Sequence, residues 1–269
     1  MELGAVTINS TSSGVLDYLA SIHESLPGKY DPALASVLLA GSVGWGIKDS
    51  QTPGADWDIH IILPTEDYAA FVASAGATFL IDDKTHFPPI FGQFHPMDWL
   101  DERLYSSDRK WWPLYLWIVE NGQWVHCTEE VRSAISRARA IFDRDNLDLI
   151  RDHFVTFCVR KLDVKSCAAN KQFVSENLYL GECLTAGLQA FSLAQGEPYP
   201  YLKWLPYWVA KNCGGTELAA AAQQCWTPKL DIRERLAVIR KMEAMIVAAI
   251  REKHGDQPWL DEWWKFLPN

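Results

Sequence analysis

Two aspartates, Asp56 and Asp58, have the spacing in this sequence that most clearly predicts chemistry. They stand at the start of a mainly apolar run, residues 56–63, that is typical of a buried strand. Residues two apart on a strand point to the same face, so both carboxylates project from one side, about 7 Å apart along the backbone. Two such anions repel each other unless a cation lies between them. The pair therefore predicts a site for a hard divalent cation, typically Mg²⁺ that carries a nucleoside triphosphate.

A glycine-rich turn at residues 41–46 precedes the aspartate pair and follows a short apolar strand predicted at 35–40. Its three glycines leave backbone amides open to close approach by phosphate. A helix that begins at Ser42 would add the attraction of its N-terminal dipole. We therefore expect Ser42 and the amides of Gly41 and Val43 to bind the β and γ phosphates of a nucleotide.

The order of these elements resembles the polymerase-beta-like nucleotidyltransferases, in which a hydrophobic residue and Gly-Ser or Gly-Gly precede an Asp-x-Asp strand. Gly41-Ser42, a gap of thirteen residues and the run from Asp56 to Ile59 carry the resemblance, which spans residues 38 to about 63. The chain is similar to the two-domain type with a C-terminal helical domain, as in antibiotic nucleotidyltransferases. The resemblance implies an α+β fold, two Mg²⁺ ions, and transfer of a nucleoside monophosphate from a triphosphate with release of pyrophosphate.

The resemblance also implies a third carboxylate on a neighbouring strand, and Asp98 is the candidate. There it would serve as a metal ligand or as a base toward the acceptor hydroxyl. Pro96 speaks against a strand at this point, because proline is confined to edges and bulges of sheets. Asp101 and Glu102 are the fallback acids. In the alternative interpretation, Asp98 caps a helix that starts near residue 100.

Three further side chains are candidates with two interpretations each. His60 shares the strand face of the aspartates and would touch a phosphate, or it is a hydrogen-bonded strand histidine. His95 would orient Asp98 or the substrate, or it has a structural role. Lys203 lies in a Lys-Trp turn that resembles one in the helical domain of relatives, where the lysine reaches the triphosphate. Otherwise it is a surface lysine beside a packed Trp204.

These residues need two domains to position them. The sequence predicts a small mixed-sheet catalytic domain at residues 1–128, with short strands and helices whose apolar residues alternate at strand or helical spacing. From about Glu130 the pattern changes to long helices with apolar residues at i, i+3 and i+4. The predicted helices are 131–142, 147–170, 172–195 and 233–253, so residues 129–269 are expected to form an all-α helical bundle.

Composition limits the partners of the chain. Its 269 residues are 48% hydrophobic and carry a net charge of −9, and a pI near 5.3 argues against a broad nucleic-acid partner. The N-terminal residues lack a signal-peptide pattern and no apolar stretch is long enough to span a membrane, so a cytoplasmic location is expected. The six cysteines have no metal-like spacing and are expected to be buried thiols.

The predicted reaction is in-line attack of an acceptor hydroxyl on the α-phosphorus of a nucleoside triphosphate such as ATP. Asp56 and Asp58 would hold the two Mg²⁺ ions, and Asp98 would assist deprotonation of the acceptor. The acceptor is expected to be a small molecule such as an aminoglycoside or lincosamide. Two alternatives stay open: nucleotidyl transfer to tRNA or to a protein side chain, as in toxin and antitoxin-like enzymes, and a non-catalytic nucleotide-binding protein.

Overall fold

The structure is a computed structural model that describes residues 10–26, 28–75, 80–105, 111–227 and 230–267. The chain divides into two compact units, residues 1–140 and 141–269. Among the described residues, all five strands belong to the first unit, and the regular structure of the second is helical. The predicted α+β fold, a small mixed sheet followed by a helical region, is confirmed.

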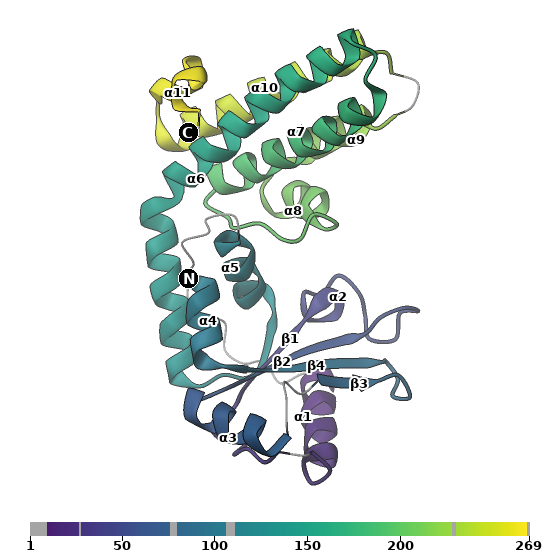
Figure 1. Ribbon diagram of the computed structural model, residues 1–269, viewed down its shortest axis with the longest axis vertical. Coiled ribbons are helices and arrows are strands. Elements are labelled where there is room, and N and C mark those ends of the chain that lie inside the picture. Colours follow the sequence, from purple (N-terminus) through teal and green to yellow (C-terminus); the bar gives the residue numbers. More distant parts are fainter. Residues whose placement is uncertain (1–9, 27, 76–79, 106–110, 228–229, 268–269) are drawn as a thin grey trace. The chain divides into compact units, whose positions relative to one another are not determined.

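The first unit is built on a five-stranded mixed sheet with the strand order β3-β4-β2-β1-β5 (Figure 1). β2 and β4 run parallel, and all other neighbours are antiparallel. The strands predicted at 35–40 and 56–63 are confirmed, whereas the region 79–104 supplies two strands and then a helix. The strands are β1 (Ser36–Ala40), β2 (Trp57–Leu63), β3 (Leu80–Asp83), β4 (Ile90–Pro96) and β5 (Gln123–His126).

Two helices, α1 (Ser10–His23) and α3 (Thr65–Ala75), cover one face of the sheet (Figure 1). Alternate residues of β2, such as Ile59, are buried in the core beneath them. Phe71 of α3 stacks on Phe94 of β4 with ring centroids 4.4 Å apart. This core determines the register of β2, because a slip by one residue would turn its apolar side chains outward and bury its aspartate.

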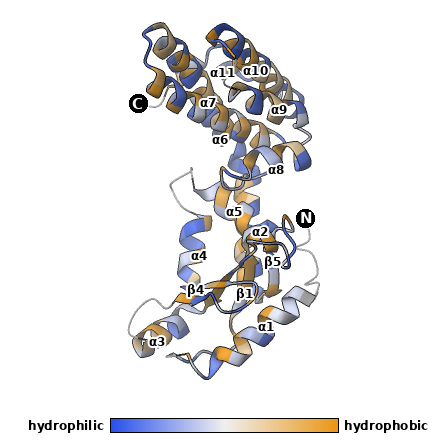
Figure 2. Ribbon diagram, turned by 90° about the vertical axis from the view of Figure 1, so that its right-hand side faces the viewer, coloured by the Kyte–Doolittle hydropathy of each residue, from blue (hydrophilic) through white to orange (hydrophobic). Residues whose placement is uncertain are grey.

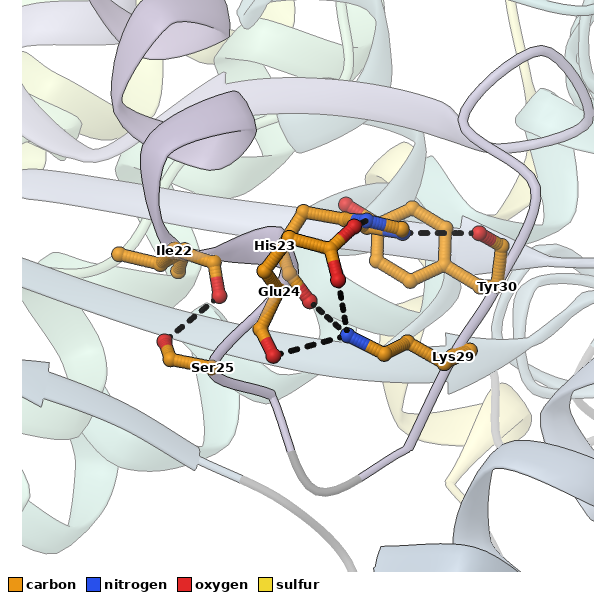
Figure 3. A network of polar contacts seen from close by, with 6 residues as sticks. All are labelled: Ile22, His23, Glu24, Ser25, Lys29 and Tyr30. Carbon is orange, nitrogen blue, oxygen red and sulfur yellow. Dashed lines mark hydrogen bonds and ion pairs between the residues drawn. The ribbon is translucent and has the colours of Figure 1, made fainter.

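A polar network closes the C-terminal end of α1 (Figure 3). Lys29 Nζ donates hydrogen bonds of 2.9 Å to the carbonyl oxygens of His23 and Glu24 and lies 3.3 Å from the Glu24 carboxylate. His23 Nε2 donates to the carbonyl oxygen of Tyr30 at 3.0 Å. The last carbonyl groups of a helix have no intrahelical partners, and a cation there also complements the helix dipole. The network therefore ends α1 and directs the chain back toward β1.

The opposite face of the sheet carries α2 (Gly41–Gly44), α4 (Met97–Leu104) and α5 (Trp112–Asn121) (Figure 1). α5 is largely hydrophobic along its length (Figure 2), and Trp117 on it is 1% exposed. The ring of Trp117 meets that of Trp45 edge-on, with centroids 4.7 Å apart.

The second unit contains only helices in its described part. A single helix, α6, spans both of the predicted helices 131–142 and 147–170, because no glycine or proline interrupts the run. It starts at residue 129, the predicted start of the second domain, but the first unit extends to residue 140. The helices are α6 (Glu129–Ala169), α7 (Phe173–Ala194), α8 (Leu205–Asn212), α9 (Thr216–Cys225), α10 (Ile232–His254), α11 (Pro258–Asp261) and the 3-10 helix η1 (Trp263–Phe266).

A buried ion pair joins two of these helices. Arg235 Nη1 of α10 lies 2.6 Å from Glu176 Oε1 of α7, and their side chains are 14% and 8% exposed. Removing one partner leaves the other charge buried without compensation, so we expect Glu176→Ala to lower the free energy of unfolding by about 3 kcal/mol. Urea unfolding followed by circular dichroism measures this loss.

The exposed ion pair between Glu262 and Lys265 is the matched control, with a separation of 2.7 Å. Glu262→Ala is expected to change the free energy of unfolding by no more than about 1 kcal/mol, because solvent screens exposed charges. Equal losses in Glu176→Ala and Glu262→Ala would contradict a special role of the buried pair.

All six cysteines are free and buried, which agrees with the sequence-based expectation. Burial raises the pKa of Cys127 to about 11 and that of Cys158 to about 12, so these thiols are protonated at neutral pH. Within the part of the chain that the structure describes, no helix has the length and apolar character needed to cross a bilayer.

Candidate active site

The carboxylate of Asp58 lies directly against the backbone of Gly41. β1 and β2 pair so that Ala40 stands opposite Asp58, and Gly41 is the first residue after β1. A methyl group added to Gly41 would lie 2.1 Å from Asp58 Oδ2. Gly41 also has a positive φ of 68°, which glycine adopts without strain. Only glycine therefore allows the carboxylate to approach the start of the turn this closely.

Asp56 stands immediately before β2 and is exposed, whereas Asp58 on β2 is half-buried. The structure thus places both predicted aspartates next to the glycine-rich turn, at the edge where β1 ends and β2 begins. Carboxylate oxygens in such a place are accessible to a ligand on the surface of the sheet.

The glycine-rich turn forms a single short helix, α2. Its backbone is tightly closed: Ile47 N and Lys48 N both donate to the carbonyl oxygen of Ser42 at 2.9 Å. A methyl group on Gly44 would lie 2.0 Å from the carbonyl oxygen of Leu39, so glycine is required there as well. The first amides of a helix have no intrahelical partner. Because α2 has only four residues, its dipole adds little to their attraction for an anion.

Asp98 does not lie on a strand beside the aspartate pair, so that prediction is wrong. It lies in the first turn of α4 and is exposed, directly after the end of β4. β4 runs parallel to β2 with Phe91 opposite Asp58 and Pro96 opposite Leu63. Pro96 is five residue steps along the strand from Phe91, about 17 Å at the usual rise. The strand ends at Pro96 and α4 begins at Met97, so Asp98 lies inside the first turn of the helix and does not cap a helix that starts near residue 100, as the alternative interpretation had it.

The fallback acids, Asp101 and Glu102, also belong to α4, at the same end of β4. Among the described residues, no group of three or more histidine, cysteine or acidic side chains is close enough to hold a metal ion. The predicted ligand set of Asp56, Asp58 and Asp98 is therefore not assembled on this sheet.

Asp56 and Asp58 by themselves fit magnesium that arrives with a nucleotide. Mg²⁺ is usually bound by one or two carboxylates together with substrate phosphates and waters, and not by a cage of protein ligands. The missing Cβ of Gly41 lets the Asp58 carboxylate lie against the start of the turn, and Asp58 is half-buried there while Asp56 is exposed. Two carboxylates would suit a Mg²⁺ ion whose remaining ligands are phosphate oxygens and waters.

His60 and His95 form a stacked pair on the same face of the sheet as Asp58. His60 Nδ1 lies 3.0 Å from His95 Nε2, and the His95 ring stacks on Trp99 with centroids 3.8 Å apart. Burial lowers the pKa of His60 to about 4. The pKa of His95 is lowered to about 3, mainly by burial and by a smaller amount by the nearby charges of His60 and Arg103. One nitrogen of the pair must accept a hydrogen bond, so at least one ring is neutral. The pair matches the structural interpretation of both histidines.

This pair predicts a loss of stability in acid. In the unfolded chain each imidazole takes a proton near pH 6.5, but in the folded protein His60 takes one only near pH 4. The unfolded state therefore binds more protons between these values, and stability falls as the pH drops through this window. For His60 alone we expect the free energy of unfolding to fall by about 3 kcal/mol between pH 7 and pH 4, and the lowered pKa of His95 adds to this loss; urea unfolding at each pH measures it.

The double variant His60→Leu/His95→Phe should lose most of this dependence, because neither replacement titrates. His254→Gln in the second unit serves as the control and should keep it. An unchanged acid dependence in the double variant would show that other groups cause it.

Lys203 lies in the second unit, in the turn before α8. Its ammonium group is 5.4 Å from the centroid of the Trp204 ring, a cation–π contact. This placement fits a surface lysine beside a packed tryptophan. Contact with a triphosphate stays a prediction.

Two residues that the sequence analysis did not select share the sheet face of Asp58. Phe91 stands opposite Asp58, and Gln93 stands opposite His60. The sequence contained a pattern that could have identified them. Ile90, Gly92 and Phe94 alternate with Phe91 and Gln93, so if the first three face the core, the other two face outward. The pairing partner of β4 was not readable from that pattern.

No family model and no curated protein matches the sequence. Among solved structures, the chain is similar to a nucleotidyltransferase-like protein from Exiguobacterium sibiricum 255-15. The two share 9% sequence identity with a TM-score of 0.47, over 97% of this chain and 81% of the other.

Proposed function

We propose that this protein is a magnesium-dependent nucleotidyltransferase of the polymerase-beta-like superfamily. The contact between the Asp58 carboxylate and the backbone of Gly41 carries the proposal. It brings an anionic metal ligand and a glycine-rich phosphate-binding turn to one point of the sheet. Neither feature alone is specific, but their contact requires a glycine at position 41 and places both at the same end of β1 and β2.

The arrangement favours nucleotidyl transfer over simple nucleotide binding because Asp56 and Asp58 are both accessible. A binding protein needs contacts to the phosphates, whereas transfer also needs charge neutralisation at the reacting phosphorus. Mg²⁺, when bound, neutralises the triphosphate and polarises its oxygens. We propose two Mg²⁺ ions, which Asp56 and Asp58 would hold.

The reaction would proceed by in-line displacement. A hydroxyl oxygen of the acceptor forms a bond to the α-phosphorus, the bond from that phosphorus to the oxygen bridging to the β-phosphorus breaks, and pyrophosphate leaves. Ser42 and the amides of Gly41 and Val43 would hold the departing phosphates. The acceptor proton passes to solvent. We assign no role in this step to Asp98, given its place on α4.

The proposed acceptor is a small hydroxylated molecule. The chain has a net charge of −9, and long anionic partners such as tRNA are bound by basic surfaces.

The direct test is incubation of the purified protein with each of the four labelled nucleoside triphosphates, Mg²⁺ and a panel of acceptors. We expect release of pyrophosphate and an acceptor heavier by one nucleoside monophosphate in the mass spectrum, both lost when EDTA removes the metal. Labelling of tRNA or of the protein itself would identify the other acceptor class. Nucleotide that binds without being consumed would contradict the proposal.

A further inference from the structure

An apolar surface lies beside Asp58 on the outward face of the sheet. The register places Phe91 of β4 next to Asp58 and Leu80 of β3 next to Gln93. Phe91 is 38% exposed and Leu80 is 49% exposed, although both stand on a sheet. The intervening residues, Ile81 and Gly92, pair on the buried side, which confirms that Phe91 and Leu80 point outward.

This chain exposes several large apolar side chains, and Phe91 and Leu80 are distinguished by their place on the sheet face of Asp58. In the described part of the chain, the Phe91 ring makes no contact with another aromatic ring. Asp82, which also faces outward next to Phe91, lies 3.0 Å from Lys84 Nζ, so its charge is balanced. The surface therefore consists of two apolar side chains, Phe91 and Leu80, beside the amide of Gln93 and a balanced charge at Asp82.

The strand order decides which part of a substrate meets this surface. β2 lies between β1 and β4, so Gly41 after β1 and Phe91 on β4 lie on opposite sides of Asp58. In an in-line displacement the entering and leaving groups also lie on opposite sides of the phosphorus. With the departing pyrophosphate on the Gly41 side, the acceptor approaches from the Phe91 side.

We propose that Phe91 and Leu80 form the acceptor subsite, and that they select an uncharged hydroxylated ring with an apolar face. This inference rests on the proposed function and adds the class of acceptor to it. The ring would stack its C–H face on Phe91, as aromatic side chains commonly line ligand sites. The amide of Gln93 offers a donor and an acceptor to the hydroxyl groups.

Three acceptors that differ in their apolar face provide the test: water, glycerol and phenyl β-glucoside. Hydrolysis of the triphosphate to monophosphate needs no acceptor subsite, so it reports on the aspartates alone. We expect the wild-type protein to use phenyl β-glucoside at least tenfold better than glycerol, as kcat/KM. Phe91→Ala should remove most of this preference by raising the KM for the glucoside about tenfold. Hydrolysis and the KM for the triphosphate should stay within about twofold.

Phe91→Tyr should keep the preference, because the ring remains. Leu80→Ala should weaken it, whereas Leu34→Ala should not. Leu34 is similarly exposed, at 48%, but precedes β1 at the end of that strand away from Gly41.

The outcomes separate the two proposals. Hydrolysis without glucoside preference, or a raised KM for the triphosphate in Phe91→Ala, would overturn the acceptor subsite and leave the proposed function intact. Absence of any hydrolysis or transfer that depends on Asp58 would overturn the proposed function and the subsite with it.

Discussion

Asp58→Asn is expected to reduce nucleotidyl transfer on the order of 10³-fold while the fold remains intact. Asparagine has the shape of aspartate, so the contact with Gly41 can persist, but the charge that would hold Mg²⁺ is lost. Pyrophosphate release at saturating Mg²⁺ and triphosphate measures the loss. Asp56→Asn should act in the same direction, and both variants should unfold at the temperature of the wild-type protein.

Asp98→Asn is the discriminating control for this prediction. It removes a carboxylate from the first turn of α4, at the far end of β4 from Asp58. We expect pyrophosphate release within about twofold of wild type, because electrostatic effects of an exposed charge at this distance are largely screened. A loss as large as that of Asp58→Asn would restore the sequence-based assignment of Asp98 to the site. Normal turnover in Asp58→Asn would refute the proposed function.

Gly41→Ala is expected to abolish transfer by displacing the Asp58 carboxylate. The added methyl group would lie 2.1 Å from Oδ2 and 2.9 Å from Cγ, so the side chain or the turn must move. A misplacement of about 1 Å in a reacting geometry is enough to cost on the order of 10²-fold in rate. The positive φ adds strain of about 1 kcal/mol, which should appear in thermal unfolding.

Gly46→Ala separates the strain from the clash. Gly46 also has a positive φ, 65°, but an added methyl group would meet nothing within 4 Å. It should therefore lose about 1 kcal/mol of stability from the strain alone, no more than Gly41→Ala loses, and keep most of the activity. Equal activity in the two variants would show that the contact between Gly41 and Asp58 has no part in the reaction.

Local patterns in the sequence predicted much of this protein. Alternation along residues 57–63 placed Asp58 and Ile59 on opposite faces of a strand, and hydrophobic burial alone enforces that alternation. Glycines and a serine after an apolar strand predicted the turn. Apolar residues at helical spacing after residue 129 predicted helices, although the continuity of α6, whose residues include no glycine or proline, was missed.

The sequence by itself therefore determined the element types, the α+β class and the aspartates at the start of β2, because each depends on residues close together in the chain. The tertiary structure decided which strands are neighbours and in which direction they run. The parallel pairing of β2 with β4 placed Phe91 beside Asp58 and Asp98 at the opposite end. That pairing depends on packing between distant segments, such as Phe71 against Phe94, and no local pattern encodes it.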